Sequence, residues 1–170
     1  MILHASQMHD VGKIGIPDQI LLKPGRLDHE EMALMQTHTA IGGRIFDDTD
    51  DEMLLMARVI ALSHHEKWDG SGYPAGLSGE MIPIEGRICA VCDVFDALTS
   101  ERPYKRAWPV EDAVKFLTDN AGRHFDPHLV PLFIKILPEI LAIREKYRDP
   151  DPDSTDPERT NPPTANPPSG

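Results

Sequence analysis

The chain has 170 residues, and 28 acidic against 17 basic side chains give it a net charge of −11 at pH 7. This acidic balance excludes a general nucleic-acid-coating protein, because binding to a polyphosphate backbone requires basic side chains. Hydrophobic residues make up 40% of the chain and charged residues 26%, proportions that are typical of a globular protein. Its longest apolar runs fall far short of the roughly 20 residues that cross a bilayer, and its start lacks a signal-peptide pattern. We therefore expect a soluble protein of the cytoplasm.

Helical patterns follow one another along most of the chain. Asp28 and Glu31 form a capping-box pattern that predicts a helix over 28–46. The expected apolar face of that helix contains Met32, Met35, Ile41 and Ile45. Further helices are expected over the ranges 51–63, 83–99, 110–120 and from 126 onward, separated by a glycine-rich loop over 68–80. The sequence thus predicts an all-α helical bundle, with Pro138 kinking or splitting the last helix.

The last 22 residues differ from the rest in composition. They hold 7 of the 16 prolines and five acidic side chains against one arginine, with almost no aliphatic residues. Such a segment cannot bury enough apolar surface to fold alone. We expect one domain over 1–148, with a net charge of −7, and a disordered, acidic, proline-rich tail over 149–170.

Cys89 and Cys92 stand three residues apart in an expected helix. Without a second cysteine pair they do not make a thiolate metal site, and two cysteines do not form a disulfide framework. We interpret both as small packing residues.

Four of the eight histidines, together with two aspartates, recur near the ends of successive expected helices: His9, Asp10, His38, His64, His65 and Asp93. Their separations of 26 to 29 residues equal about one helix plus a connection, so neighbouring helices can converge on one centre. Neutral imidazoles mixed with carboxylates suit Fe, Mn or Zn more than calcium or magnesium.

Each of these residues also has a structural interpretation. The pairs His9–Asp10 and His64–His65 can be exposed on helix ends, and Asp93 can lie at the edge of the core. A buried, unpaired carboxylate is costly, however, which favours a metal or cationic partner for Asp93 or Asp96. The remaining histidines are expected to be structural or on the surface: His4, His29, His124 and His128.

Three segments in order resemble the HD-GYP domain, a subgroup of the HD phosphohydrolases. They are HDVGKIGIPD at 9–18, HHEKWDGSGYP at 64–74 and DVFDALTS at 93–100. RPYK at 102–105 and GRHFDP at 122–127 also fit, so the resemblance covers about residues 5–133. Several long motifs in the same order make a chance similarity implausible.

The resemblance implies a helical bundle with two or three divalent metal ions, Fe or Mn, that hydrolyses cyclic di-GMP to linear pGpG and in some members on to GMP. Carried over position by position, the metal ligands are His9, Asp10, His38, His64, His65 and Asp93. Asp10 would bridge two metals and, with Lys13, form the catalytic pair. Lys13, Arg102 and Lys105 match positions that contact phosphate, and Tyr73 lies on the loop beside the substrate.

The implied chemistry is physically reasonable. A phosphodiester is an anion that water attacks poorly, so a site must activate the water and neutralise the charge on the phosphate oxygens. Because the body of the chain is acidic, its local cations must admit a doubly anionic substrate: Lys13, Arg102, Lys105 and Arg106.

Members of the HD-GYP group also use metal ligands from a helix before the His-Asp motif, whereas eight residues precede His9 here. We therefore expect a domain that is truncated at its N-terminus relative to the family, either as a piece of a longer protein with a receiver or sensor domain or as a short form. Two other functions stay open. One is a noncatalytic module that binds diguanylate cyclases or response regulators, and the other is an HD hydrolase for another nucleotide. A homodimer is also open, whereas no membrane or nucleic-acid polymer partner is expected.

Overall fold

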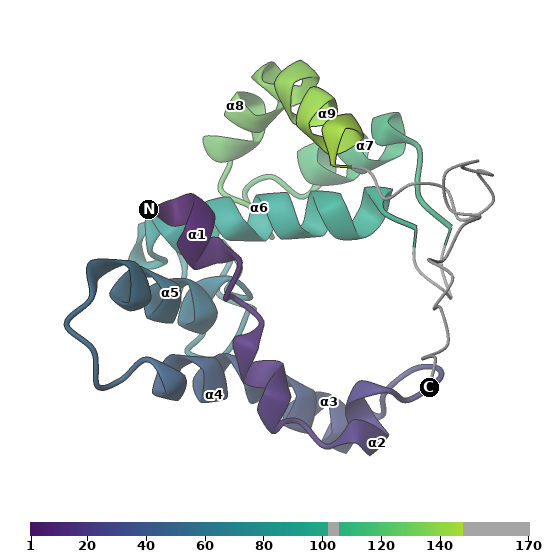
Figure 1. Ribbon diagram of the computed structural model, residues 1–170. Coiled ribbons are helices and arrows are strands. Elements are labelled where there is room, and N and C mark those ends of the chain that lie inside the picture. The colour runs from purple at the N-terminus through teal and green to yellow at the C-terminus, as the bar shows by residue number, and fades with distance from the viewer. Residues whose placement is uncertain (102–105, 148–170) are drawn as a thin grey trace, which may run out of the picture. The chain divides into compact units, whose positions relative to one another are not determined.

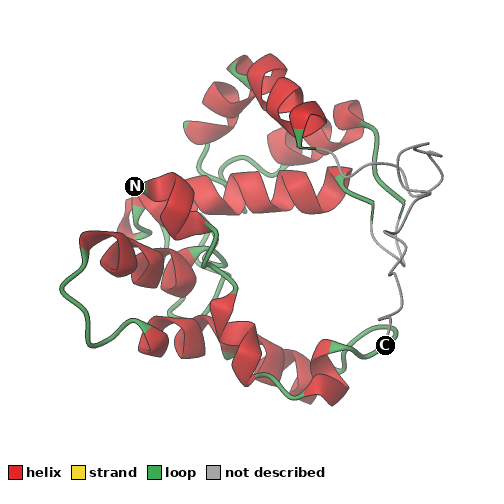
Figure 2. Cartoon of the chain, viewed as in Figure 1, coloured by secondary structure: helices red, strands yellow, loops and turns green. Residues whose placement is uncertain are grey.

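The computed structural model describes residues 1–101 and 106–147, and its regular elements there are helices (Figures 1 and 2). No strand occurs within these two ranges; an isolated bridge joins Ala121 to Phe125. The predicted all-α class is confirmed. The described residues fall into two compact units, one over Met1–Lys135 and one that begins at Ile136. In the described residues no helix combines the length and the apolar character needed to span a membrane.

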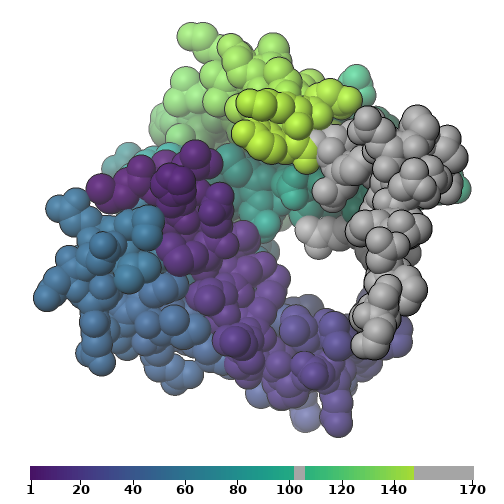
Figure 3. Space-filling model, in the orientation of Figure 1, coloured from purple at the N-terminus to yellow at the C-terminus, as the bar shows by residue number. Residues whose placement is uncertain are grey.

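Three short helices precede residue 28, where the sequence predicted none. They are α1 (Ile2–Ser6), the 3₁₀ helix η1 (Val11–Gly15) and α2 (Asp18–Leu21). Each is too short to show a hydrophobic period, which explains why the pattern did not reveal them. α1 nevertheless contributes Ala5 to a core cluster with Ala57 and Ile60. Figure 3 shows this purple segment packed along the blue residues that follow it.

The single helix expected over 28–46 is wrong in one respect: the structure has two helices, α3 (His29–Gln36) and α4 (His38–Ile45). The predicted capping box is present, with Asp28 accepting from the Glu31 amide and Glu31 from the Asp28 amide. At the break, side chains donate to carbonyl oxygens of the last turn of α3, Thr37 to Leu34 at 2.6 Å and His38 to Met35 at 2.7 Å. These bonds compete with the helical backbone bonds and interrupt the helix.

The predicted apolar face of this segment is also wrong in part. Met32 and Ile45 are 43% and 48% exposed, and the buried residues of α4 are His38, Thr39, Gly42 and Gly43. The reason is a close approach of backbones rather than large side chains. A Cβ on Gly12 of η1 would lie 1.9 Å from the His38 carbonyl oxygen. This approach holds the residue before η1, Asp10, against the start of α4.

The central helices follow the predicted ranges. α5 (Glu52–Ser63) begins at Asp51, whose side chain accepts from the Met53 and Leu54 amides, and it packs against α1, α4 and α6. α6 (Ile84–Thr99) follows the predicted loop, which contains a 3₁₀ turn, η2 (Gly79–Met81). Cys89 of α6 is buried as expected, but Cys92 is exposed, because it lies with Asp96 on a side of α6 that faces solvent.

The remaining helices are α7 (Val110–Asp119), α8 (Leu129–Lys135) and α9 (Leu137–Lys146). The last predicted helix is split, as expected from Pro138, which lies in the first turn of α9. In the first unit, α6 packs against α7 and α8, with the rings of Phe95 and Phe133 5.0 Å apart. The predicted tail over 149–170 and its boundary at residue 148 lie outside the described residues.

Candidate metal centre

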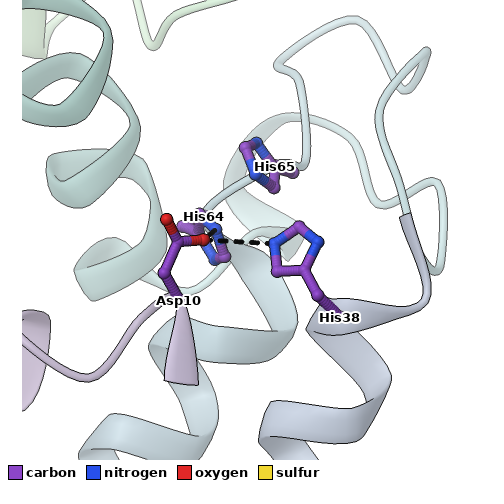
Figure 4. A group of neighbouring side chains, drawn as sticks. All are labelled: Asp10, His38, His64 and His65. Atoms are coloured by element: carbon purple, nitrogen blue, oxygen red, sulfur yellow. Dashed lines mark ion pairs between the residues drawn. The ribbon is translucent and has the colours of Figure 1, made fainter. Parts of the chain in front are cut away.

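Four of the six predicted metal ligands form one cluster in the structure. One ligand atom from each of Asp10, His38, His64 and His65 lies within 4.8 Å of the others (Figure 4). Each comes from the end of a helix: Asp10 directly precedes η1, His38 begins α4, and His64 directly follows α5. The predicted convergence of helix ends is therefore what places these side chains together.

The two oxygens of Asp10 face different partners. Oδ1 lies 3.3 Å from Nε2 of His38 and 3.7 Å from Nε2 of His64. Oδ2 lies 3.5 Å from Nε2 of His9, and the same nitrogen is 3.7 Å from Oδ1 of Asp93. The other two predicted ligands thus adjoin the cluster on the Oδ2 side of Asp10.

Three of the imidazole rings are held in one tautomer by their own backbone. Nδ1 lies 2.7 Å from the Ser6 carbonyl oxygen in His9, and 3.0 Å from the Ile60 carbonyl oxygen in His64. The corresponding bond of His38 goes to Met35. Because a carbonyl oxygen only accepts, Nδ1 carries the proton and Nε2 of a neutral ring carries a lone pair. This arrangement is characteristic of histidines that bind metal through Nε2.

Three ligand atoms of this cluster have no hydrogen-bond partner. Oδ1 of Asp10 and Nε2 of His38 and His64 are all buried and unsatisfied. Three electron-rich atoms that face one another repel unless a cation lies between them, and a buried polar atom without a partner is costly. The donor set of carboxylate oxygen and imidazole nitrogen suits a divalent transition metal. The cluster can therefore hold a metal ion.

Lys13 adjoins the same carboxylate. Its Nζ donates a hydrogen bond to Oδ2 of Asp10, and its side chain is 39% exposed. Burial alone would raise the pKa of Asp10, but the hydrogen bond and the positive charge of Lys13 are among the causes that hold that pKa below its usual range. Asp10 is thus an anion, as a metal ligand must be.

Tyr73 and His65 form the side of the cluster nearest the glycine-rich loop. Their rings stack at a centroid distance of 4.8 Å and an interplanar angle of 29°. Burial, together with the neighbouring His64 and His38, lowers the pKa of His65 to about 3, so its ring is neutral at pH 7. Burial and the charges of Asp10 and Asp93 raise the pKa of Tyr73 to about 12, so its phenol keeps its proton.

The sequence interpretation missed Glu66, which follows the two histidines in the same motif. This side chain is 2% exposed, and its two oxygens accept hydrogen bonds from the loop amides of Ala75 at 2.7 Å and Leu77 at 3.0 Å. An acidic residue directly before a glycine-rich loop was the available signal, since such a loop has amides that need acceptors.

A second missed interaction lies at the other side of the loop. Arg87 of α6 forms a 2.7 Å ion pair with Asp126 and lies 5.9 Å from the ring centre of Trp68. The amides of Trp68 and Asp69 donate to the carbonyl oxygens of His124 and Arg123. The segment 123–126 therefore braces the loop against α6.

The remaining predicted residues lie elsewhere or outside the described ranges. Arg102 and Lys105 are outside the described residues, and Arg106 and Asp96 are exposed. His4, His29 and His128 are exposed, in agreement with their expected surface role. The ring of His124 stacks on Phe125 at 4.3 Å, which supports a structural role.

The family follows from comparison of this chain with known proteins. Residues 2–129 match the HD domain family, and they include the four clustered ligands. The chain belongs to the HD domain family. The predicted resemblance is thereby confirmed at the level of this family.

Its relatives include bacterial phosphodiesterases. A 3′3′-cGAMP-specific phosphodiesterase 2 of Vibrio cholerae is 50% identical over 149 residues, which cover 88% of this chain and 28% of that protein. A cyclic di-GMP phosphodiesterase of Thermotoga maritima is 47% identical over 150 residues, which cover 88% of this chain and 41% of that protein. The cyclic di-GMP phosphodiesterase response regulator RpfG of Xanthomonas campestris is 50% identical over 131 residues, which cover 77% of this chain and 35% of that protein. The chain thus spans less than half the length of these relatives.

A solved structure shares the fold. The crystal structure of a cyclic GMP-AMP-specific phosphodiesterase of Vibrio cholerae aligns with a TM-score of 0.55 and 19% sequence identity, over 84% of this chain and 40% of that one. At this identity the likeness concerns the helical HD fold alone.

Proposed function

We propose that this chain is the metal-dependent hydrolase part of a phosphodiesterase that converts cyclic di-GMP to linear pGpG. The observation that carries the proposal is the set of three buried, unsatisfied electron-pair donors: Asp10 Oδ1, His38 Nε2 and His64 Nε2. The high identity to relatives named cyclic di-GMP phosphodiesterases supports the substrate class. A cyclic dinucleotide is therefore the ligand for which the site is best suited.

The proposed ligands divide into two sets that share Asp10. One set comprises Asp10 Oδ1 with His38, His64 and His65, and the other comprises Asp10 Oδ2 with His9 and Asp93. A carboxylate whose two oxygens face two sets can bridge two ions, and we propose Fe or Mn as the metal. When bound, such ions neutralise phosphate charge and lower the pKa of water toward neutrality.

The reaction itself is a hydrolysis that breaks one phosphorus–oxygen bond. A water oxygen adds to phosphorus, and the 3′ oxygen of the neighbouring ribose leaves and takes up a proton. The product keeps its phosphate on the 5′ oxygen, which is the arrangement in pGpG. Charge accumulates on the phosphate oxygens during this step, so fixed positive charges beside them lower the barrier.

The chain supplies such groups beside the cluster. Nζ of Lys13 donates to Asp10 Oδ2, and its partly exposed side chain can rotate to donate to a substrate phosphate instead. Tyr73 keeps its phenol proton, because burial and the charges of Asp10 and Asp93 raise its pKa to about 12, and it can donate a hydrogen bond to the same anion. Arg102 and Lys105 complete the proposed phosphate contacts on the basis of the sequence alone.

A second substrate, 3′3′-cGAMP, is favoured by a specific observation. A relative that is 50% identical to this chain is named as specific for that compound. The two cyclic dinucleotides differ in one base and share the phosphodiester bonds on which the proposed groups would act. Discrimination between them therefore depends on contacts to the base.

Anaerobic incubation of the purified chain with Fe(II) or Mn(II) tests these proposals. Cyclic di-GMP and 3′3′-cGAMP are supplied in parallel, linear products are followed by chromatography, and metal per chain is measured. We expect turnover that His64→Ala abolishes and that His128→Ala, at an exposed position, leaves unchanged. Full metal occupancy with tight nucleotide binding but no turnover would contradict the enzyme and favour the noncatalytic binding module. Turnover of 3′3′-cGAMP alone would select the second substrate.

A further inference from the structure

Glu66 is a buried carboxylate that the proposed reaction does not use. Its side chain is almost fully buried, and in the described part of the chain its side-chain partners are two backbone amides of the following loop, those of Ala75 and Leu77. Burying a carboxylate costs desolvation energy, and no cation offsets that cost among these contacts. What the carboxylate gains is two charge-assisted hydrogen bonds to one short stretch of backbone.

These two bonds belong to a set of contacts that hold the loop backbone close to the residues before it. The Tyr73 amide donates to the His65 carbonyl oxygen at 3.2 Å, next to Glu66. A Cβ on Gly72 would lie 2.3 Å from the Lys67 backbone nitrogen, so the loop backbone touches the backbone of the metal-cluster motif. Residues 72–77 are thus anchored at three points to 65–67, two of which are the oxygens of Glu66.

The anchored stretch carries Tyr73 at the edge of the cluster. Its ring stacks on His65 and lies edge-on to His38 at a centroid distance of 6.4 Å. A stacked ring has a fixed direction for its hydroxyl group only if the backbone on both sides of it is fixed. The His65 carbonyl oxygen holds the backbone at Tyr73 itself, and the Glu66 carboxylate holds the residues after it.

We propose that Glu66 is a positioning residue for the cyclic dinucleotide reaction, whose carboxylate fixes the loop so that Tyr73 is held against His65 before substrate binds. The kinetic part of this inference rests on the proposed function. The hydrogen bonds of the Glu66 carboxylate go to the loop, and Glu66 is not one of the four clustered ligands, so it acts through the loop. Because the loop is already ordered, less conformational entropy is lost when substrate binds.

Glu66→Gln tests the inference because it keeps the size of the side chain and replaces one acceptor oxygen by a donor. One loop amide then loses its partner and faces an NH₂ group. Glu80→Gln is the matched control, since Glu80 is exposed in the same loop and the change in charge is identical. We expect kcat/KM for the cyclic dinucleotide to fall about tenfold in Glu66→Gln, mainly through KM, as for a lost binding contact. Metal content and the Glu80→Gln kinetics should stay at the wild-type level.

A double-mutant cycle with Tyr73→Ala separates positioning from a merely structural role. If Glu66 acts through Tyr73, adding Glu66→Gln to Tyr73→Ala changes kcat/KM by less than about twofold. The proposal is overturned if the double variant loses kcat/KM by the full product of the two single-variant effects. A loss of metal in Glu66→Gln alone overturns it as well. If Glu66→Gln does not unfold cooperatively, Glu66→Asp replaces it in the same cycle, because the shorter side chain keeps the charge but cannot reach both amides.

Amide hydrogen exchange gives a readout that needs no activity. In Glu66→Gln we expect faster exchange at Ala75 or Leu77 and at Tyr73 by about tenfold, with unchanged exchange in α5 and α6. Unchanged exchange at all three loop amides overturns the inference. If the wild-type chain shows no turnover, the proposed function fails, and the exchange result still decides whether Glu66 holds the loop.

Discussion

Asp10 belongs to the motif at 9–18 and Glu66 to the motif at 64–74. Both are carboxylates, yet their surroundings are opposite. Oδ1 of Asp10 is buried without a hydrogen-bond partner and faces the lone pairs of two imidazoles. Both oxygens of Glu66 accept from backbone amides. The first arrangement is stable only when a cation joins it, whereas the second is complete within the chain. The hydrogen-bond partners of a buried carboxylate thus distinguish a ligand site from an internal anchor.

Removing the Asp10 carboxylate gives the largest expected effect. In Asp10→Ala both proposed metal sets lose their shared ligand, so turnover should fall more than about 1,000-fold, because groups that act as a unit are lost together. Metal content should fall with it. The measurement is product formation and metal per chain in one preparation, with Asp96→Ala as control at an exposed position of α6. Retention of both activity and metal would refute the assigned centre.

Gly12→Ala tests the close approach that places Asp10. The added Cβ would meet two backbone atoms of α4, the His38 oxygen at 1.9 Å and the Gly42 nitrogen at 2.4 Å. Backbone cannot give way cheaply, so the free energy of unfolding should fall by about 3 kcal/mol. In Gly15→Ala the nearest atom, at 2.9 Å, is the end of the flexible Ile41 side chain, and we expect a loss below about 1 kcal/mol. Urea unfolding of both variants checks this, and equal losses would contradict the packing argument.

A third buried carboxylate, that of Asp126, is neutralised by a side chain. Asp126→Asn tests this ion pair. Asp126 pairs with Arg87 at 2.7 Å and its side chain is 3% exposed, so the substitution leaves the largely buried guanidinium of Arg87, 16% exposed, without its counter-ion. We expect a loss of about 3 kcal/mol in stability, with metal binding retained. Asp119→Asn removes an exposed partner of Lys115 and should leave the free energy of unfolding close to that of the wild type. Thermal melts with and without added Mn(II) compare the two, and loss of metal in Asp126→Asn would show that the brace and the cluster are not separate.

The smallest expected effect is a change in the pH dependence of stability, and it concerns His124 in the segment 123–126. Burial, with Lys67 nearby, lowers the pKa of His124 from 6.5 to about 4 in the folded chain. Between these values the unfolded chain binds the proton and the folded chain does not, so stability falls as pH decreases from 6.5 toward 4. His124→Gln should remove about 1 kcal/mol of that loss, a modest amount because the ring is partly exposed to solvent. Unfolding free energies at pH 7 and pH 5 provide the test, with the exposed His128→Gln expected to follow the wild type.

The fold and the cluster were predictable where the sequence carries local signals. The capping box at Asp28, the range of α5 and the split at Pro138 each depend on nearby residues, and each is present. The histidine spacing predicted that helix ends converge, and four of the six predicted ligands meet in one cluster.

Other features depend on contacts that no local pattern encodes. The break at Thr37 results from side chains that replace backbone donors, and the buried face of α4 depends on a tertiary approach at Gly12. Glu66 and the Arg87–Asp126 pair reach partners 9 to 39 residues away. Such pairings require knowledge of which segments lie side by side, and a single sequence does not provide it.

The histidine rings of the cluster take their orientation from main-chain oxygens three or four residues earlier, those of Ser6, Met35 and Ile60. An oxygen of the main chain is present whatever residue occupies the position. Which ring nitrogen faces Asp10 is therefore set by the main chain and not by the side chains at these three positions. For this one property, the orientation of the rings, only the histidines themselves have to be specified by the sequence.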